Sequence, residues 1–70
     1  MQSHSDVIAL WPTVAAFALD VNAPKPTVRV WKRNGRIPPN RFDQVIGAAE
    51  RRGFEGVTYR FLTEALRVSG

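Results

Sequence analysis

The chain has 70 residues, a formal net charge of +4 and no cysteine. Its length allows a single small domain, residues 1–70, and the lack of cysteine excludes disulfides, thiol catalysis and cysteine zinc sites. Hydrophobic residues make up 44% of the chain, which argues against disorder, and no apolar run approaches the roughly 18 residues that a membrane span needs.

The N-terminal segment predicts a short helix after a frayed end. Residues 1–4 are expected to be frayed, so His4, the only histidine, is a poor candidate for a general base or a metal ligand. Ser5 is predicted to cap a helix over residues 6–10. The helix then ends before Pro12, because the residue before a proline disfavours the helical conformation. No charged start followed by an apolar stretch is present, so we expect no signal peptide.

Residues 13–33 predict two short helices joined by a tight turn. The first helix, residues 13–21, is followed by Asn22 at a position that needs a positive φ, which asparagine tolerates. The second helix, residues 26–33, begins with a proline that suits a first helical turn, and residues 34–35 end it with a left-handed cap. The side chains expected to face the core are Val14, Phe17, Ala18, Val21, Val28 and Trp31. This layout is typical of a helix-turn-helix that reads DNA.

The outer face of the second helix is predicted to be basic. Arginine can donate two hydrogen bonds to guanine, valine can contact the methyl group of thymine, and lysine suits phosphates. The predicted base-reading residues are Lys25, Pro26, Arg29, Val30 and Arg33, and the predicted phosphate-binding residues are Thr27, Lys32, Arg36 and Arg41. The alternative interpretation of the same face is a solvated basic surface on an ordinary small helical domain.

The positive charge of the chain is concentrated around that helix. Residues 25–41 hold six of the ten lysines and arginines and none of the six acidic residues. The rest of the chain is therefore slightly negative. A concentrated basic segment favours a polyanionic partner. A membrane surface is a weaker candidate, because membrane-bound helices need a free apolar face and here that face is required for the core.

The remainder of the chain predicts two more helices. Residues 36–39 form a stiff proline-rich link whose Ile37 is expected to enter the core. Asn40 or the prolines before it are expected to open a helix whose apolar stripe runs over residues 42–49 and which ends at Gly53. Thr58 is predicted to cap a last helix over residues 58–68. The expected core positions are Phe42, Val45, Ile46 and Ala49 in the first of these helices and Val57, Leu62, Ala65 and Leu66 around the second.

Several side chains lie outside these stripes. Arg51 and Arg52 are expected to face water. The last helix carries more apolar residues than its inward face can hold: Tyr59, Phe61 and Val68. We expect these residues either to mediate self-association or to pack beneath the helix at residues 6–10.

Four segments resemble the small Cro-like regulators and phage repressors of phages and bacteria. They are ALWP (residues 9–12), FALDV (17–21), VRVWKR (28–33) and GRIP (35–38). In that class a Trp-Lys-Arg followed by Gly-x-Ile-Pro closes the recognition helix. The resemblance implies an all-α, compact four-to-five-helix domain that binds a palindromic operator as a homodimer and regulates transcription. It implies the same five base-reading positions, with two departures: Asn22 replaces the usual turn glycine, and Pro26 stands where a polar residue is common.

Catalysis is not expected. The glycines fit no nucleotide-binding spacing, and the acidic residues are expected to be solvated and scattered over separate helices. The residues concerned are Gly35, Gly47, Gly53 and Gly56, and Asp20, Asp43, Glu50 and Glu64. The sequence therefore predicts neither an enzyme nor a bound cofactor or metal ion.

The sequence as a whole predicts a duplex-DNA-binding transcriptional regulator, cytoplasmic and nucleoid-associated, with residues 26–33 in the major groove of a palindromic operator. An alternative is a protein-interaction module that contacts RNA polymerase or another regulator through Leu19, Tyr59 and Phe61, with DNA contact secondary. A third interpretation is a DNA-binding antitoxin or architectural protein with little sequence preference.

Overall fold

The computed structural model describes the backbone of residues 3–69 and the side chains of residues 3–66. Within that range the chain forms five α-helices and one 3₁₀ turn and contains no strand. These elements are α1 (His4–Ile8), α2 (Val14–Val21), α3 (Lys25–Asn34), η1 (Pro39–Arg41), α4 (Phe42–Arg52) and α5 (Tyr59–Ser69). The predicted all-helical class is confirmed. None of the helices in the described range is long and apolar enough to cross a membrane.

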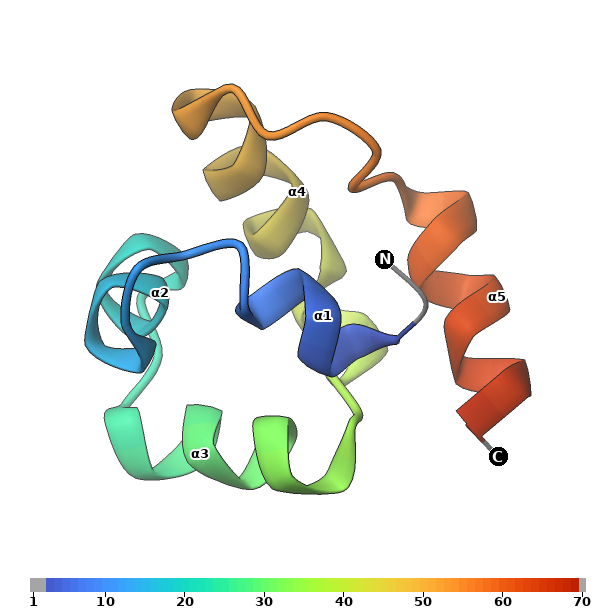
Figure 1. The fold of residues 1–70 in the computed structure, drawn as a ribbon, viewed down its shortest axis with the longest axis horizontal. Helices are drawn as coiled ribbons and strands as arrows, with labels where there is room; N and C mark the ends of the chain where they lie inside the picture. The colour runs from blue at the N-terminus through green and yellow to red at the C-terminus, as the bar shows by residue number, and fades with distance from the viewer. Residues whose placement is uncertain (1–2, 70) are drawn as a thin grey trace.

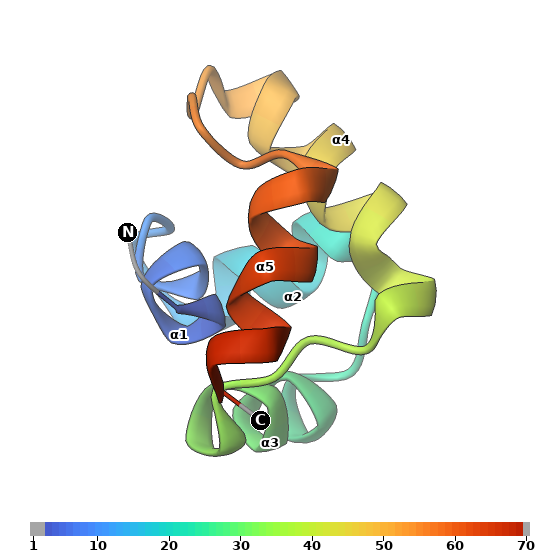
Figure 2. The same cartoon turned by 90° about the vertical axis from the view of Figure 1, so that its right-hand side faces the viewer.

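The helix α3 lies along one end of the molecule. It runs below α1 and α2 in Figure 1, while α4 lies at the opposite end and α5 to one side. The view turned by 90° in Figure 2 again places α3 at the lower end, with α5 in front. Because α3 packs against α1 and α2 on one side only, its other side is left at the surface.

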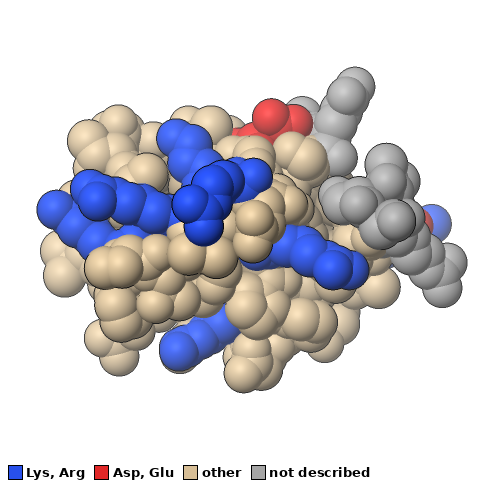
Figure 3. Space-filling view, turned by 90° about the horizontal axis from the view of Figure 1, so that it is seen from below, with Lys and Arg blue, Asp and Glu red and all other residues tan. Residues whose placement is uncertain are grey.

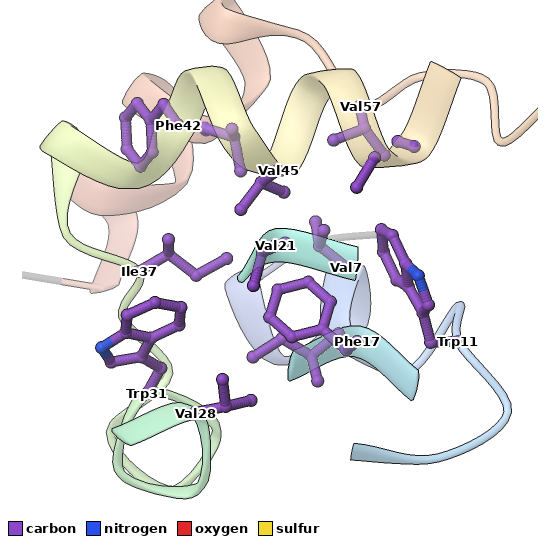
Figure 4. Packing of buried hydrophobic residues seen from close by; sticks show 14 of the residues in the cluster. Val7, Trp11, Phe17, Val21, Val28, Trp31, Ile37, Phe42, Val45 and Val57 are labelled. Atoms are coloured by element: carbon purple, nitrogen blue, oxygen red, sulfur yellow. The ribbon is translucent and has the colours of Figure 1, made fainter. Parts of the chain in front are cut away.

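One apolar cluster connects the helices, and Phe17 of α2 lies at its centre (Figure 4). The Phe17 ring is fully buried and makes edge-to-face contacts with Trp11 and Trp31, at centroid distances of 4.8 and 6.5 Å. Such edge-to-face pairs add to the free energy that burial of the rings contributes. The predicted core position of Ile37 is confirmed, since its side chain is fully buried.

Left-handed caps end α2 and α3. Asn22 has a φ of 57° and Gly35 a φ of 68°, and both residues cap the helix before them. At the start of α2, the Thr13 hydroxyl accepts a hydrogen bond of 3.0 Å from the Ala16 amide. The predicted positive φ of Asn22 and the predicted left-handed cap at residues 34–35, which ends α3, are therefore confirmed. The structure begins α3 one residue earlier than the sequence predicted, at Lys25.

The predicted start of the first helix is wrong. Ser3 caps α1, not Ser5, and Ser3 and Asp6 form a reciprocal capping box: the Ser3 hydroxyl accepts from the Asp6 amide, and the Asp6 carboxylate accepts from the Ser3 amide. The helix accordingly starts at His4 and ends at Ile8. Ser-x-x-Asp is a local pattern that satisfies two free amides at a helix start, so the sequence contained the signal.

The prediction that residues 1–4 are frayed is wrong for residues 3 and 4, and residues 1–2 lie outside the described range. His4 is fully buried and bonded on both ring nitrogens. The Ile37 amide donates to His4 Nδ1 at 2.7 Å, so Nε2 carries the proton and donates to the Leu62 carbonyl at 2.8 Å. The ring also meets Phe42 edge to face at 5.7 Å. His4 thus joins α1 to the link after α3 and to α5.

The last two helices follow the predicted pattern closely. In α4, Ile46 is only half-buried, while Ala48, which the predicted stripe omitted, is fully buried. The Thr58 hydroxyl accepts a hydrogen bond of 3.1 Å from the Phe61 amide, which confirms the predicted cap of α5. The side chain of Val68, one of the predicted surplus apolar residues, lies outside the described residues.

Candidate nucleic-acid interface

The candidate nucleic-acid interface lies on α3, one side of which is buried while the other is exposed. Val28 and Trp31 are buried against the core, and they lie three residues apart on the inward side. At about 100° per residue, the direction opposite to these two side chains is occupied by positions 26 and 33, with 29 and 30 beside them. The packing of Val28 and Trp31 therefore decides which side chains α3 presents outward.

All five residues predicted to read bases are exposed. They are Lys25, Pro26, Arg29, Val30 and Arg33. Of the predicted phosphate-binding residues, Lys32 and Arg36 are exposed and Thr27 and Arg41 are half-buried. Arg41 lies outside α3, in η1, and its guanidinium donates a hydrogen bond of 3.0 Å to Gln44 Oε1. The structure therefore brings together on α3 all predicted site residues except Arg36 and Arg41.

The outward side of α3 has a charged flank and an uncharged flank. Helical periodicity places Lys25, Arg29 and Lys32 on one flank of the row through positions 26 and 33. Thr27, Val30 and Asn34 lie on the other flank. Neither flank carries an acidic residue, because residues 25–41 contain none. The helix thus offers cationic donors along one side and neutral side chains along the other.

Figure 3 shows this end of the molecule from below. Lysine and arginine side chains spread across the face, and acidic side chains are visible only at its periphery. Because nearby charges of one sign add their potentials, a face of this kind attracts polyanions more strongly than the net charge of +4 alone suggests.

The first helix supports α3 from behind. The Ser5 hydroxyl donates a hydrogen bond of 2.9 Å to the Lys32 carbonyl in the last turn of α3. The Lys32 carbonyl also accepts a hydrogen bond of 3.3 Å from the Gly35 amide, so the Ser5 hydroxyl is its second donor and connects α1 to the end of α3. This role of Ser5 was not predicted from the sequence, because Ser5 and Lys32 are 27 positions apart.

Asp20 is not the solvated carboxylate that the sequence predicted. It forms an ion pair with the Arg52 guanidinium and accepts a hydrogen bond of 2.8 Å from Trp11 Nε1. Arg51 also donates to the Asp20 carbonyl at 3.0 Å, so Arg51 and Arg52, although exposed, do not simply face water. The bond to Arg52 first, and that to Trp11 second, lower the pKa of Asp20 below its ordinary value. This network ties α2 to the end of α4.

Replacing Asp20 with asparagine should lower the midpoint temperature of unfolding at pH 7. It should also reduce the decrease of that temperature as the pH is lowered. Since the folded state lowers the pKa of Asp20, the stabilisation is complete above the ordinary value of 3.8 and is lost as the pH falls through the lower folded value. Thermal unfolding monitored by circular dichroism between about pH 7 and 2 measures both effects. Glu55→Gln, at an exposed loop position, is the control and should keep the wild-type profile. An Asp20→Asn profile parallel to that of the wild type would contradict the network.

Two large apolar side chains lie exposed away from α3. Leu19 on α2 is 82% exposed and Tyr59 at the start of α5 is 56% exposed. Leu19 borders a hollow of about 360 Å³ that continues over Ala18, Asn22, Ala23 and Pro24. Tyr59 contacts Phe42 edge to face at 5.5 Å, and Phe61 is half-buried against the core. Leu19 and Tyr59 are therefore exposed apolar side chains that lie outside α3.

The described residues contain no group of three or more side chains suited to holding a metal ion. Comparison of the chain with protein-family models, with curated proteins and with solved structures found no match.

Proposed function

We propose that this protein is a Cro-like, sequence-specific duplex-DNA-binding regulator that inserts α3 into the major groove. The observation that carries the proposal is the outward side of α3. There Arg29 and Arg33 are exposed beside the uncharged Pro26 and Val30, and no acidic residue lies among them. Phosphate contacts alone need only positive charge, whereas reading bases needs side chains of different chemistry at fixed places on a rigid element. The burial of Val28 and Trp31 provides that rigidity.

The α2–turn–α3 unit supports the Cro-like type. Ala18 of α2 is buried, and the left-handed Asn22 reverses the chain directly after α2. A helix-turn-helix of this type reads base edges with residues at the start of its second helix, which here are Lys25 and Pro26. Pro26 has no amide to donate, so its contribution to base reading is apolar.

The proposal includes a homodimer on an inverted repeat. A single α3 covers only a few base pairs, and a symmetric pair of such helices reaches two half-sites about 34–36 Å apart. Selection of binders from a pool of random duplex DNA, followed by sequencing, tests the proposal. Enrichment of an inverted repeat with half-sites about one helical turn apart is the expected result. Enrichment of a single half-site would support base reading by α3 and contradict the homodimer. Binding without enrichment would indicate an architectural protein.

Replacing Arg29 with alanine should cost on the order of 1–3 kcal/mol of binding free energy and relax the preference at one base pair. The reason is that Arg29 projects outward from α3 and has the donors to engage guanine on two atoms. Equilibrium binding to the selected duplex, and to its single-base variants, measures both effects. Arg60→Ala on α5 is the matched control, because Arg60 is exposed and paired with Glu64. Uniform weakening across all sequences would reassign Arg29 to a phosphate contact.

A second candidate function is protein binding, favoured by the exposure of Leu19 beside a hollow and of Tyr59. In this case the contact is with RNA polymerase or another regulator, and the basic face assists. Binding of duplex DNA by the purified protein at near-physiological salt separates the two candidates. A protein-interaction module of this kind does not bind DNA under those conditions without its partner.

A further inference from the structure

Val30 is an unexpected residue on the outward side of α3. It is 41% exposed, although the helix around it is strongly polar. A β-branched residue has lower helix propensity than the lysine and arginine at neighbouring positions. Val30 is not part of the apolar cluster that forms the core, and helix propensity does not favour a valine here. Contact with an apolar group on a ligand does account for it.

The position of Val30 relative to Arg29 and Arg33 restricts that ligand. A rise of about 1.5 Å per residue separates Arg29 from Arg33 by roughly 6 Å along the helix axis, which spans about two base-pair steps of the duplex. Val30 lies between the two arginines along the axis. It is turned toward the uncharged flank of α3, with Thr27 and Asn34.

Valine has no donor or acceptor in its side chain. Placed against the edge of a G·C pair, it would leave the polar atoms of that edge without partners, which is unfavourable. The 5-methyl group of thymine is the apolar feature that the major groove offers. The two arginines, in contrast, each match the pair of acceptors on guanine.

We infer that each DNA half-site contains two G·C pairs separated by one A·T pair, whose thymine methyl group packs against Val30. Arg29 and Arg33 donate to the guanines of the outer pairs. This inference rests on the proposed function and deepens it, since it names the bases that α3 reads. The neutral flank faces the thymine, and Lys32 on the charged flank faces a phosphate of the neighbouring backbone.

The test uses the duplex enriched from the random pool, remade with uracil in place of individual thymines. Uracil pairs as thymine does but lacks the methyl group. For the wild-type protein, one uracil in each half-site, between the two guanines, should weaken binding about fourfold per half-site, as expected for loss of one buried methyl. For Val30→Ala, the thymine and uracil duplexes should bind equally. Leu19→Ala, on α2, is the control and should retain the full difference.

The guanines are tested with 7-deazaguanine, which lacks the N7 acceptor. Substitution at one outer guanine should weaken binding of the wild type but not of Arg29→Ala, and substitution at the other should weaken binding of the wild type but not of Arg33→Ala. Circular dichroism checks that each variant is folded. We expect this result because the side chains of Arg29, Val30 and Arg33 are exposed.

Two kinds of failure are distinguishable. If no duplex is enriched or bound, the proposed function and this inference are both overturned. If one sequence is enriched but lacks thymine between two guanines, the inference alone is overturned. The same holds if uracil has no effect on the wild type or has an equal effect on Val30→Ala.

Discussion

Replacing His4 with phenylalanine should destabilise the folded protein by about 1–3 kcal/mol, the cost of leaving the buried Ile37 amide without a partner. The Leu62 carbonyl lies inside α5, so it keeps its acceptor role within the helix. Phenylalanine keeps an aromatic ring of similar size and the edge-to-face contact with Phe42, but it has no nitrogen to accept from the Ile37 amide or to donate to the Leu62 carbonyl. A domain of this size has a total stability of only about 5–15 kcal/mol. The variant is therefore expected to fold with clearly reduced stability.

Urea unfolding monitored by circular dichroism and tryptophan fluorescence measures this loss. Two further variants separate the two hydrogen bonds. The Asn side chain of His4→Asn places an oxygen near the position of Nδ1, so this variant should retain the bond from Ile37. The amide nitrogen of His4→Gln reaches toward the position of Nε2, so this variant should retain the bond to Leu62. Each should be more stable than His4→Phe, and equal stability of all four proteins would show that the bonds contribute nothing.

The local features of the fold were predictable from the sequence because each depends on neighbouring residues. The left-handed Asn22, the Gly35 cap and the cap of α5 by Thr58 follow from backbone preferences and short-range hydrogen bonds. The burial of Val28 and Trp31 follows from helical periodicity. Helical periodicity also predicts from the sequence which side chains of α3 point outward.

The features that the sequence did not predict join residues far apart in the chain. His4 contacts Ile37 and Leu62, 33 and 58 positions away, and Asp20 pairs with Arg52, 32 positions away. No local pattern specifies such pairs, since they depend on how the helices pack. A histidine near a chain end reads as exposed unless its neighbours in space are known. The capping box of Ser3 is different, because its partner is three residues away and the pattern was present in the sequence.

For the candidate site, the sequence predicted which residues face outward but not how α3 is held. Two hydrogen bonds connect α1 to the segment from Lys32 to Ile37, which ends α3 and leads away from it. The Ser5 hydroxyl donates to the Lys32 carbonyl, and the Ile37 amide donates to His4. The residues that would touch DNA and the residues that position them are thus distinct sets. Substitutions in the first set should change DNA affinity with little effect on stability, and substitutions in the second should change stability first.

Phe17 belongs to the second set, and its replacement with alanine should cost about 3–5 kcal/mol of stability. The ring is fully buried between Trp11 and Trp31, so its removal leaves a cavity between α2 and α3 that the surrounding helices can fill only in part (Figure 4). Phe17→Leu retains most of the volume and should lose less.

Urea unfolding monitored by the fluorescence of Trp11 and Trp31 measures the loss of stability directly at the altered site. The position of α3 depends on Trp31, whose contact with Phe17 is one of the links between α2 and α3. If α3 binds DNA as proposed, the DNA affinity of the fraction that remains folded should therefore fall more in Phe17→Ala than in Phe17→Leu, although Phe17 is not on the outward side of α3. If affinity instead followed only the folded fraction, the packing of Phe17 would stabilise the domain without orienting α3. In that case the orientation of α3 would depend on its contacts with α1, which include the hydrogen bond from Ser5.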